Sequence, residues 1–124
     1  MKKIQTDKAP NPAGHYSQAV VHNGMVFVSG QIPIDPLTGE KITGSIEDQT
    51  AQVLKNLTAI LEASGSSLAQ VLKVTVYITD ISLWGKVNEV YSQVFGEHKP
   101  ARAIVPTRDL HYGFKIEVEA IATV

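Results

Sequence analysis

The spacing of the apolar residues changes period along this chain of 124 residues, and that change constrains the fold more than any other feature. In 45–65 apolar side chains recur every three or four residues, as on one face of an α-helix. In 70–79 they recur at every second residue, as on one face of a strand. The same two periods return in 83–96 and 115–124. A chain with this order of segments must pack helices against a sheet.

Both predicted helices are bounded by capping residues. Ser45 followed by Asp48 resembles a capping box with aspartate in place of glutamate, and Gly65 and Gly96 are natural C-terminal stops. We expect the first helix to bury Val53, Leu54, Leu57, Ile60 and Leu61. The apolar stripe of the second helix consists of Leu83, Trp84, Val87, Val90, Tyr91, Val94 and Phe95.

The two predicted strands of the C-terminal half each have one apolar face. In the first strand this face consists of Leu72, Val74, Val76 and Ile78. In the second it consists of Ile116, Val118, Ala120, Ala122 and Val124, while Glu117 and Glu119 face the other way. The opposite face of the sheet also holds Tyr77 and Ile121, and a half-apolar face in so small a domain predicts a subunit interface.

A β-hairpin is predicted near the N-terminus. The β-rich runs 16–21 and 25–29 meet at Asn23-Gly24, a pair that readily takes the positive φ angles of a tight turn. The stretch 30–45 contains two prolines and three glycines, which indicates a loop with at most a short strand. The order of elements predicts a single α+β domain over residues 1–124, with a mixed sheet and both helices on one face.

Composition excludes several classes of function. The formal net charge of -1 gives no general attraction to nucleic acid or to an anionic membrane. The chain has no cysteine, no apolar run of membrane-spanning length and no signal-peptide core, so we expect a soluble cytoplasmic protein. The motifs GxGxxG, HExxH, GxSxG and the P-loop are absent, and the four histidines lack metal-ligand spacing. We therefore expect no metal site.

Arg102 is the most unusual residue, because it interrupts the apolar run of "HKPARAIVP". A guanidinium stays charged at physiological pH and is costly to bury without an anionic partner. Arg102 therefore either faces water or has a partner, which is Glu117 or Glu119 in a structural ion pair, or else a ligand. The residues leave this choice open.

Four other polar residues stand at the ends or edges of elements, namely Tyr16, Ser29, Asn88 and Glu117. Tyr16 and Ser29 are consistent with ordinary strand ends, and Asn88 with the solvated flank of a helix. Glu117 is consistent with a wet strand face. Each is also consistent with a ligand contact, and local pattern does not decide between the two interpretations.

Taken together, four segments resemble the reactive intermediate deaminase family, the enamine/imine deaminases. The segments are "APNPAGHYSQAV", "VSGQIPIDPLTGE", "VTVYITDI" with "VNEVY", and "KPAR" followed by "KIEVEAIA". The resemblance implies a chorismate-mutase-like α+β fold and a homotrimer with sites in the clefts between subunits. It also implies hydrolysis of short 2-imino acids, such as 2-iminobutanoate and 2-iminopropanoate, to 2-keto acids and ammonia without a cofactor.

The resemblance also assigns roles to residues. Arg102 matches the arginine that grips the substrate carboxylate, and Glu117 matches the acid that positions the attacking water. The remaining substrate-binding positions are Tyr16, Gly30, Asn88 and Ile104. Ile104 stands where many relatives have cysteine, and the segment from Pro106 to Phe114 departs from the family pattern, so we expect a changed substrate range.

Two other functions fit the same residues. One is a non-catalytic trimer that binds a metabolite carboxylate and reports it to a partner. The other is a ribonuclease or translation inhibitor, against which the near-neutral charge argues.

Overall fold

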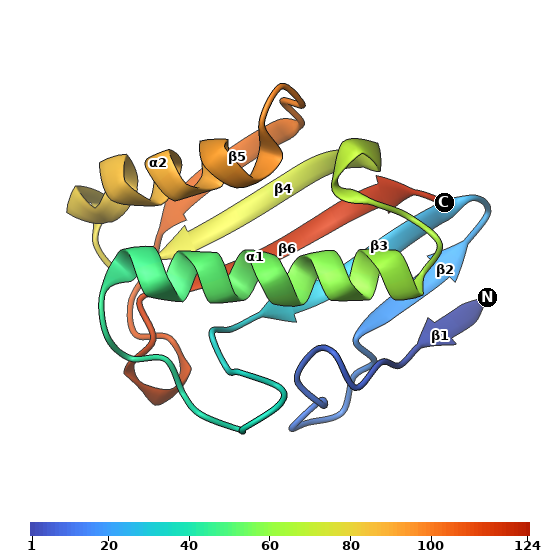
Figure 1. Cartoon of the computed structure of the whole chain (residues 1–124), viewed down its shortest axis with the longest axis horizontal. Coiled ribbons are helices and arrows are strands. Elements are labelled where there is room, and N and C mark those ends of the chain that lie inside the picture. Colours follow the sequence, from blue (N-terminus) through green and yellow to red (C-terminus); the bar gives the residue numbers. More distant parts are fainter.

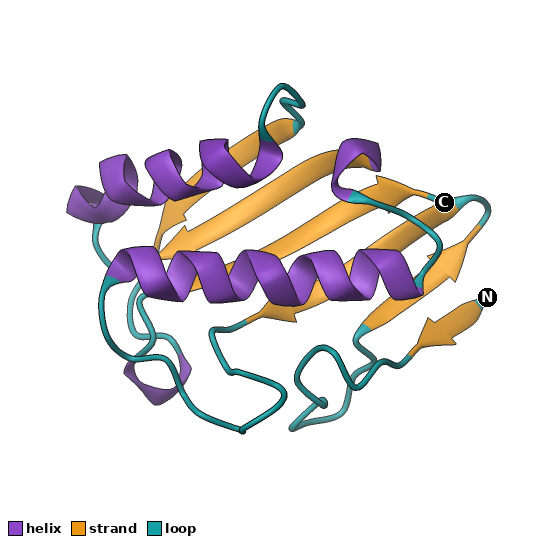
Figure 2. Ribbon diagram, in the orientation of Figure 1, coloured by secondary structure: helices purple, strands orange, loops and turns teal.

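The alternating segments form one six-stranded sheet with two helices on the same face, and the structure, a computed structural model, describes all of residues 1–124 (Figures 1 and 2). The strands are β1 (Lys2–Ile4), β2 (Ala19–His22), β3 (Met25–Gln31), β4 (Val71–Ile78), β5 (Ala101–Pro106) and β6 (Ile116–Thr123). The helices are α1 (Ile46–Ala63) and α2 (Trp84–Phe95), and short 3-10 turns occupy Leu68–Gln70, Ile81–Leu83 and His111–Gly113. The predicted α+β class is confirmed.

The strand order is β1-β2-β3-β6-β4-β5. Only β4 and β5 run parallel, and α2 provides the crossover between them. All other neighbours are antiparallel, so the sheet is mixed as predicted. β5 is an edge strand, which leaves one side of its backbone without a partner strand in the protomer.

The predicted caps and turn are present. The Ser45 hydroxyl accepts a hydrogen bond of 3.1 Å from the N–H of Asp48, at the start of α1. Asn23 and Gly24 have φ angles of 49° and 75°, the positive values that a two-residue hairpin turn requires. Gly96 ends α2 with a φ of 60°.

The N-terminal region differs from the prediction in two ways. β2 begins at Ala19 rather than at Tyr16, and β1, which was not predicted, pairs with it. β1 is short and starts with two lysines, so it has no apolar alternation by which to recognise it. The loop after β3 contains only an isolated bridge between Ile34 and Lys41, in agreement with the predicted loop with at most a short strand.

The hydrophobic core lies between the sheet and the two helices, and two residues of the predicted apolar strand faces, Leu72 and Val124, lie outside it because both are exposed. Leu72 is 47% exposed, whereas its neighbour Val71 is buried. The pairing of β4 with β6 shifts register between Val71 and Lys73, and this bulge turns Leu72 away from the core. Val74, two residues further on, faces the core as predicted.

α2 is less deeply buried than its apolar stripe suggests. Val87, Tyr91 and Phe95 are buried, but Trp84 and Val94 are exposed. In Figures 1 and 2 this helix lies over the β4 and β5 edge of the sheet, beside α1. One flank of α2 therefore borders the outside of the protomer.

Three buried side-chain amides form hydrogen bonds with the backbone of the irregular segments. Gln18 bonds to the N-terminal segment, Asn56 to the loop after β3, and Gln49 to the residue preceding β6. Because these amides satisfy backbone groups that no strand pairs, they hold the loops around the sheet in place. Neither helix has the length and apolarity needed to cross a membrane.

Candidate functional site

Arg102 lies on β5 and points toward α2. It is paired in register with Val74 of β4, whose side chain faces the helix-covered side of the sheet, and directly paired residues share a face. Its Nη1 donates a hydrogen bond of 2.9 Å to Oδ1 of Asn88 on α2. The side-chain partner within the chain is thus a neutral amide and not Glu117 or Glu119, so the predicted alternative of a structural ion pair is wrong for the protomer.

Two aromatic rings of α2 flank the same guanidinium. The Arg102 Cζ lies 4.7 Å from the ring centroid of Tyr91 and 5.8 Å from that of Trp84. Trp84, Asn88 and Tyr91 are spaced four and three residues apart, which puts them on one helical face. Burial raises the pKa of Tyr91 to about 12, against the opposing effect of the Arg102 charge, so the phenol is neutral at physiological pH.

A cavity of about 440 Å³ opens beside Arg102. Its lining residues are Asn88, Tyr91, Ser92, Phe95, Gly96, His98, Lys99, Pro100 and Arg102. Two permanent cations and an imidazole face this space, and no carboxylate does. Such a lining suits a small anionic ligand.

Ile104 does not line this cavity. It is half-buried two residues after Arg102, on the same face of β5, and packs against the hydrophobic core. In the protomer it therefore supports the strand that carries Arg102.

Glu117 lies on the other face of the sheet. It is paired with Tyr77 of β4, and Tyr77 is three residues from Val74, so the two face opposite sides. The Glu117 carboxyl is half-buried, and its pKa is raised chiefly by desolvation. The electrostatic effect of the neighbouring His111 lowers the pKa of Glu117, and that of Glu119 raises it.

Gly30, near the end of β3, lies against the side chain of Glu117. A Cβ built on Gly30 would overlap the Glu117 carboxylate and lie 3.0 Å from its Cδ. Real Cβ atoms do not approach so closely, so the carboxylate can adopt this position because position 30 has no side chain. The glycine is needed here for space.

Tyr16 and Gly30 meet at a narrow cavity of about 40 Å³. Tyr112 also lines it, with a φ of 57° that is uncommon for an aromatic residue. Tyr112 stacks against the ammonium of Lys41 at 4.8 Å. Ser29, by contrast, donates its hydroxyl to the carbonyl of a neighbouring loop residue, so its role in the protomer is structural.

The predicted site residues thus form two groups within one protomer. Arg102 and Asn88 lie on the helix-covered face, and Tyr16, Gly30 and Glu117 lie around the other side. Sequence reasoning assigned Trp84 and Tyr91 only to the apolar stripe of α2. Their spacing on either side of Asn88 was the available signal for their contact with Arg102.

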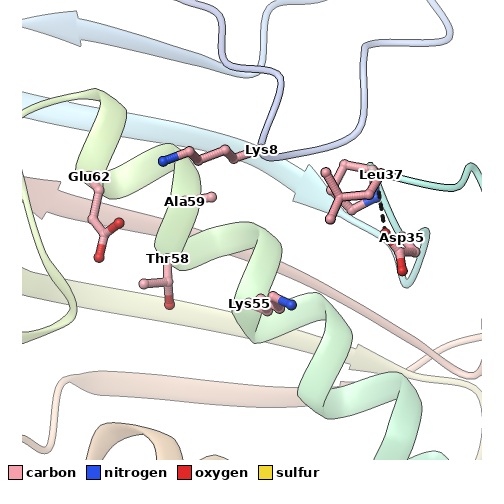
Figure 3. Close-up of a pocket in the computed structure, with 8 residues that line it drawn as sticks. Lys8, Asp35, Leu37, Lys55, Thr58, Ala59 and Glu62 are labelled. Carbon is pink, nitrogen blue, oxygen red and sulfur yellow. Dashed lines mark hydrogen bonds between the residues drawn. The ribbon is translucent and has the colours of Figure 1, made fainter.

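A further cavity of about 470 Å³ lies between the N-terminal segment, the loop after β3 and α1 (Figure 3). Its lining residues are Lys8, Asp35, Pro36, Leu37, Lys55, Thr58, Ala59 and Glu62. None of them is a predicted site residue, and Asp35 accepts a hydrogen bond from the N–H of Leu37. With two cations balanced by two carboxylates, this groove does not select a ligand by charge.

Fold and site together define a small α+β protein with an arginine-centred cavity suited to an anion. Residues 6–124 match the family model described as endoribonuclease L-PSP. The chain is 55% identical over 119 residues to a RutC family protein of Pyrococcus horikoshii, covering 96% of this chain and 94% of that one. It is 45% identical over 121 residues to the 2-iminobutanoate/2-iminopropanoate deaminase of Rattus norvegicus, covering 98% and 88%.

Solved structures agree with these matches. RidA from the Antarctic bacterium Psychrobacter sp. PAMC 21119 superposes with a TM-score of 0.95 at 43% identity, covering 100% of both chains. E. coli TdcF with bound serine also gives a TM-score of 0.95, at 42% identity, covering 100% of this chain and 99% of the other. The chain belongs to the reactive intermediate deaminase family, as its motifs indicated.

Proposed function

We propose that this protein hydrolyses short 2-imino acids, such as 2-iminobutanoate and 2-iminopropanoate, to 2-keto acids and ammonia. The observation that carries the proposal is Arg102, held by Asn88 beside a cavity that contains cations and no carboxylate. The name of the rat relative and the serine bound to TdcF support it, because both point to small molecules built like amino acids.

Arg102 is suited to bind the substrate carboxylate. A guanidinium has five N–H donors, and Asn88 takes one of them, which leaves an edge for a two-pronged carboxylate contact. Such a charged hydrogen bond contributes about 1.5–3 kcal/mol. We therefore assign Arg102 to substrate binding, with Asn88 as the residue that orients it.

Glu117 is the proposed acid–base group. Its carboxylate accepts a proton from a water molecule as the water oxygen attacks C2 of the protonated imine, giving a carbinolamine. Return of that proton to nitrogen lets ammonia leave. The C2 carbonyl forms as the carbinolamine hydroxyl gives its proton to the Glu117 carboxylate, which then releases the proton to ammonia or solvent. Desolvation raises the pKa of Glu117, which brings it closer to the operating pH and improves such a base. No cofactor enters this scheme.

One protomer does not bring these two groups together, and a homotrimer with sites in its clefts resolves this. Arg102 lies on the edge strand β5, while Glu117 lies on the uncovered face of the sheet. In a cyclic trimer the edge of one copy can meet the uncovered face of the next, so that each site takes Arg102 from one subunit and Glu117 from its neighbour. Tyr16, Gly30 and Ile104 would complete the cleft.

The activity is tested by generating the imine in place, with threonine and a threonine dehydratase, and measuring its decay. We expect wild type to accelerate hydrolysis over buffer, and Arg102→Ala to lose roughly 10- to 150-fold in kcat/KM. The matched control is Arg108→Ala, because Arg108 is the other arginine of the chain and is exposed. If wild type gives no acceleration but binds 2-oxobutanoate, the protein is a non-catalytic carboxylate-binding trimer instead.

The shared site is tested by mixing two strongly impaired variants. Arg102→Ala and Glu117→Ala are each expected to retain no more than about a tenth of wild-type kcat/KM as pure trimers. In trimers mixed at random in equal amounts, about one quarter of the clefts combine an intact Arg102 with an intact Glu117, so about a quarter of wild-type activity returns. If both residues of a site came from one subunit, no mixture would regain activity.

The family description names a ribonuclease, and RNA cleavage is the remaining alternative. The net charge of -1 gives no general attraction to the phosphate backbone. Salt-sensitive RNA cleavage by purified wild type, lost in Arg102→Ala, would favour that function over the deaminase.

A further inference from the structure

The Arg102 side chain lies against one face of α2. The residues of that face make more contacts with the guanidinium than carboxylate binding alone requires. Asn88 provides a hydrogen bond of 2.9 Å, and the rings of Tyr91 and Trp84 lie 4.7 Å and 5.8 Å from the Arg102 Cζ. Arginine has a long flexible stem, and here it projects from an edge strand. A single hydrogen bond at Nη1 leaves the guanidinium free to turn about that bond, whereas a flat ring against it fixes its plane.

The Tyr91 ring is itself held by the fold. It is only 6% exposed and stacks on Phe95 with centroids 4.5 Å apart and planes inclined by 26°. Phe95 lies 6.4 Å from the ring of His98, whose Nε2 is 2.7 Å from the carbonyl oxygen of Val71. A continuous chain of contacts therefore runs from β4 through the end of α2 to Arg102.

The hydroxyl of Tyr91 has no part in this arrangement. Its oxygen is the one buried side-chain polar atom without a hydrogen-bond partner. Burial of a hydroxyl without a partner costs stability, so the contribution of Tyr91 to the site must come from its ring. Trp84 differs, since it is 43% exposed and flanks Arg102 from the open side.

We propose that Tyr91 is a positioning residue, which through its ring holds the Arg102 guanidinium with its carboxylate-binding edge toward the cavity. Trp84 flanks the same guanidinium on the side open to solvent. This inference rests on the proposed function only in naming Arg102 as the carboxylate-binding group. Loss of the ring loosens Arg102 before any ligand arrives, so it weakens ground-state binding more than it slows the chemical step.

The orientation of Arg102 can be measured in the unliganded protein by nitrogen-15 NMR of the guanidinium groups. The chain has two arginines, so Arg102 gives one of two side-chain Nε signals and the exposed Arg108 serves as the mobile reference. We expect an ordered Arg102 in wild type and in Tyr91→Phe, and a mobile one in Tyr91→Leu. Val87→Ala is the matched control, because Val87 is fully buried on α2 and does not line the Arg102 cavity.

Ligand binding is measured with 2-oxobutanoate, the product keto acid, using the fluorescence of Trp84, the one tryptophan of the chain. We expect Tyr91→Leu to raise the dissociation constant and KM about tenfold with kcat within about threefold, and Tyr91→Phe to stay within about twofold of wild type. Val87→Ala should lower thermal stability without changing the affinity.

Two results would overturn the inference: an ordered Arg102 and unchanged affinity in Tyr91→Leu, or an equal loss of order in Val87→Ala. If wild type binds no 2-oxobutanoate while Arg102 order still depends on the Tyr91 ring, the proposed function fails and the positioning role stands.

Discussion

A methyl group at position 30 should impair activity far more than stability. In the variant Gly30→Ala the new Cβ would lie 3.0 Å from Cδ and 3.3 Å from Cγ of Glu117, whereas carbon atoms in contact are normally about 3.5–4.0 Å apart. It would also overlap the carboxylate oxygen Oε2. The Glu117 carboxyl must therefore move by roughly 1 Å, and a displacement of that size costs about 100-fold in kcat/KM when it occurs at a reacting group.

The stability of this variant should change little. The φ angle of Gly30 is not in the positive range, so alanine meets no backbone strain there. Alanine allows the unfolded chain fewer conformations than glycine does, which stabilises the folded state by about 0.4–1 kcal/mol. The off-rotamer side chain of Glu117 costs about 0.5–1.5 kcal/mol. The two effects leave a net change within about 1 kcal/mol, or roughly 4 °C in Tm.

The assay is imine decay in the dehydratase-coupled reaction, with thermal unfolding measured on the same samples. The control is Gly44→Ala, since a Cβ at Gly44 meets nothing within 4 Å and its φ angle is not positive. It should keep full activity. Wild-type kcat/KM in Gly30→Ala, to within about threefold, would refute the reasoning, because it would show that the position of the Glu117 carboxylate does not matter to the reaction.

Three further variants test the electrostatics and the helix cap. Burial raises the pKa of Glu117, so folding favours its protonated form, and its contribution to stability is lost as pH rises through the folded-state pKa. Glu117→Gln should therefore be inactive. It should raise Tm at about pH 8, where the native carboxylate is charged, and the gain in Tm should vanish at about pH 4. An unchanged Tm at both pH values would contradict this. Glu119→Gln should keep activity and replace the charged 2.8 Å hydrogen bond from Tyr77 with one to a neutral amide oxygen, which a lowered phenol pKa would report. Ser45→Ala should lower unfolding free energy by about 1 kcal/mol without affecting kcat, and a denaturant titration measures it.

Local patterns predicted most of the elements correctly, because the forces that set them act over a few residues. The turn at Asn23-Gly24, the Ser45 cap and the stops at Gly65 and Gly96 depend on backbone angles and neighbouring hydrogen bonds. β1 was missed because its partner strand, rather than its own composition, makes it a strand.

Errors in burial arose where neighbouring strands and helices decided the outcome. Strict alternation put Leu72 in the core, but the bulge in the pairing of β4 with β6 turned it outward. The stripe of α2 included Trp84 because the residue is apolar, yet α2 lies at the edge of the sheet and leaves that ring partly open. The contact between Trp84 and Arg102 follows from this placement.

The sequence by itself determined the types of most elements and the family, and it indicated the residues that we propose carry the chemistry. Except at the bulge beside Leu72, alternation within a strand also determined which residues of that strand share a face, since the period of two is local. Only the tertiary structure decided that Arg102 and Glu117 face opposite sides of the sheet. The two residues are on different strands, and the register of each with β4, at Val74 and Tyr77, sets their relation. Register depends on long-range pairing and core packing, which the spacing of residues along the chain does not record.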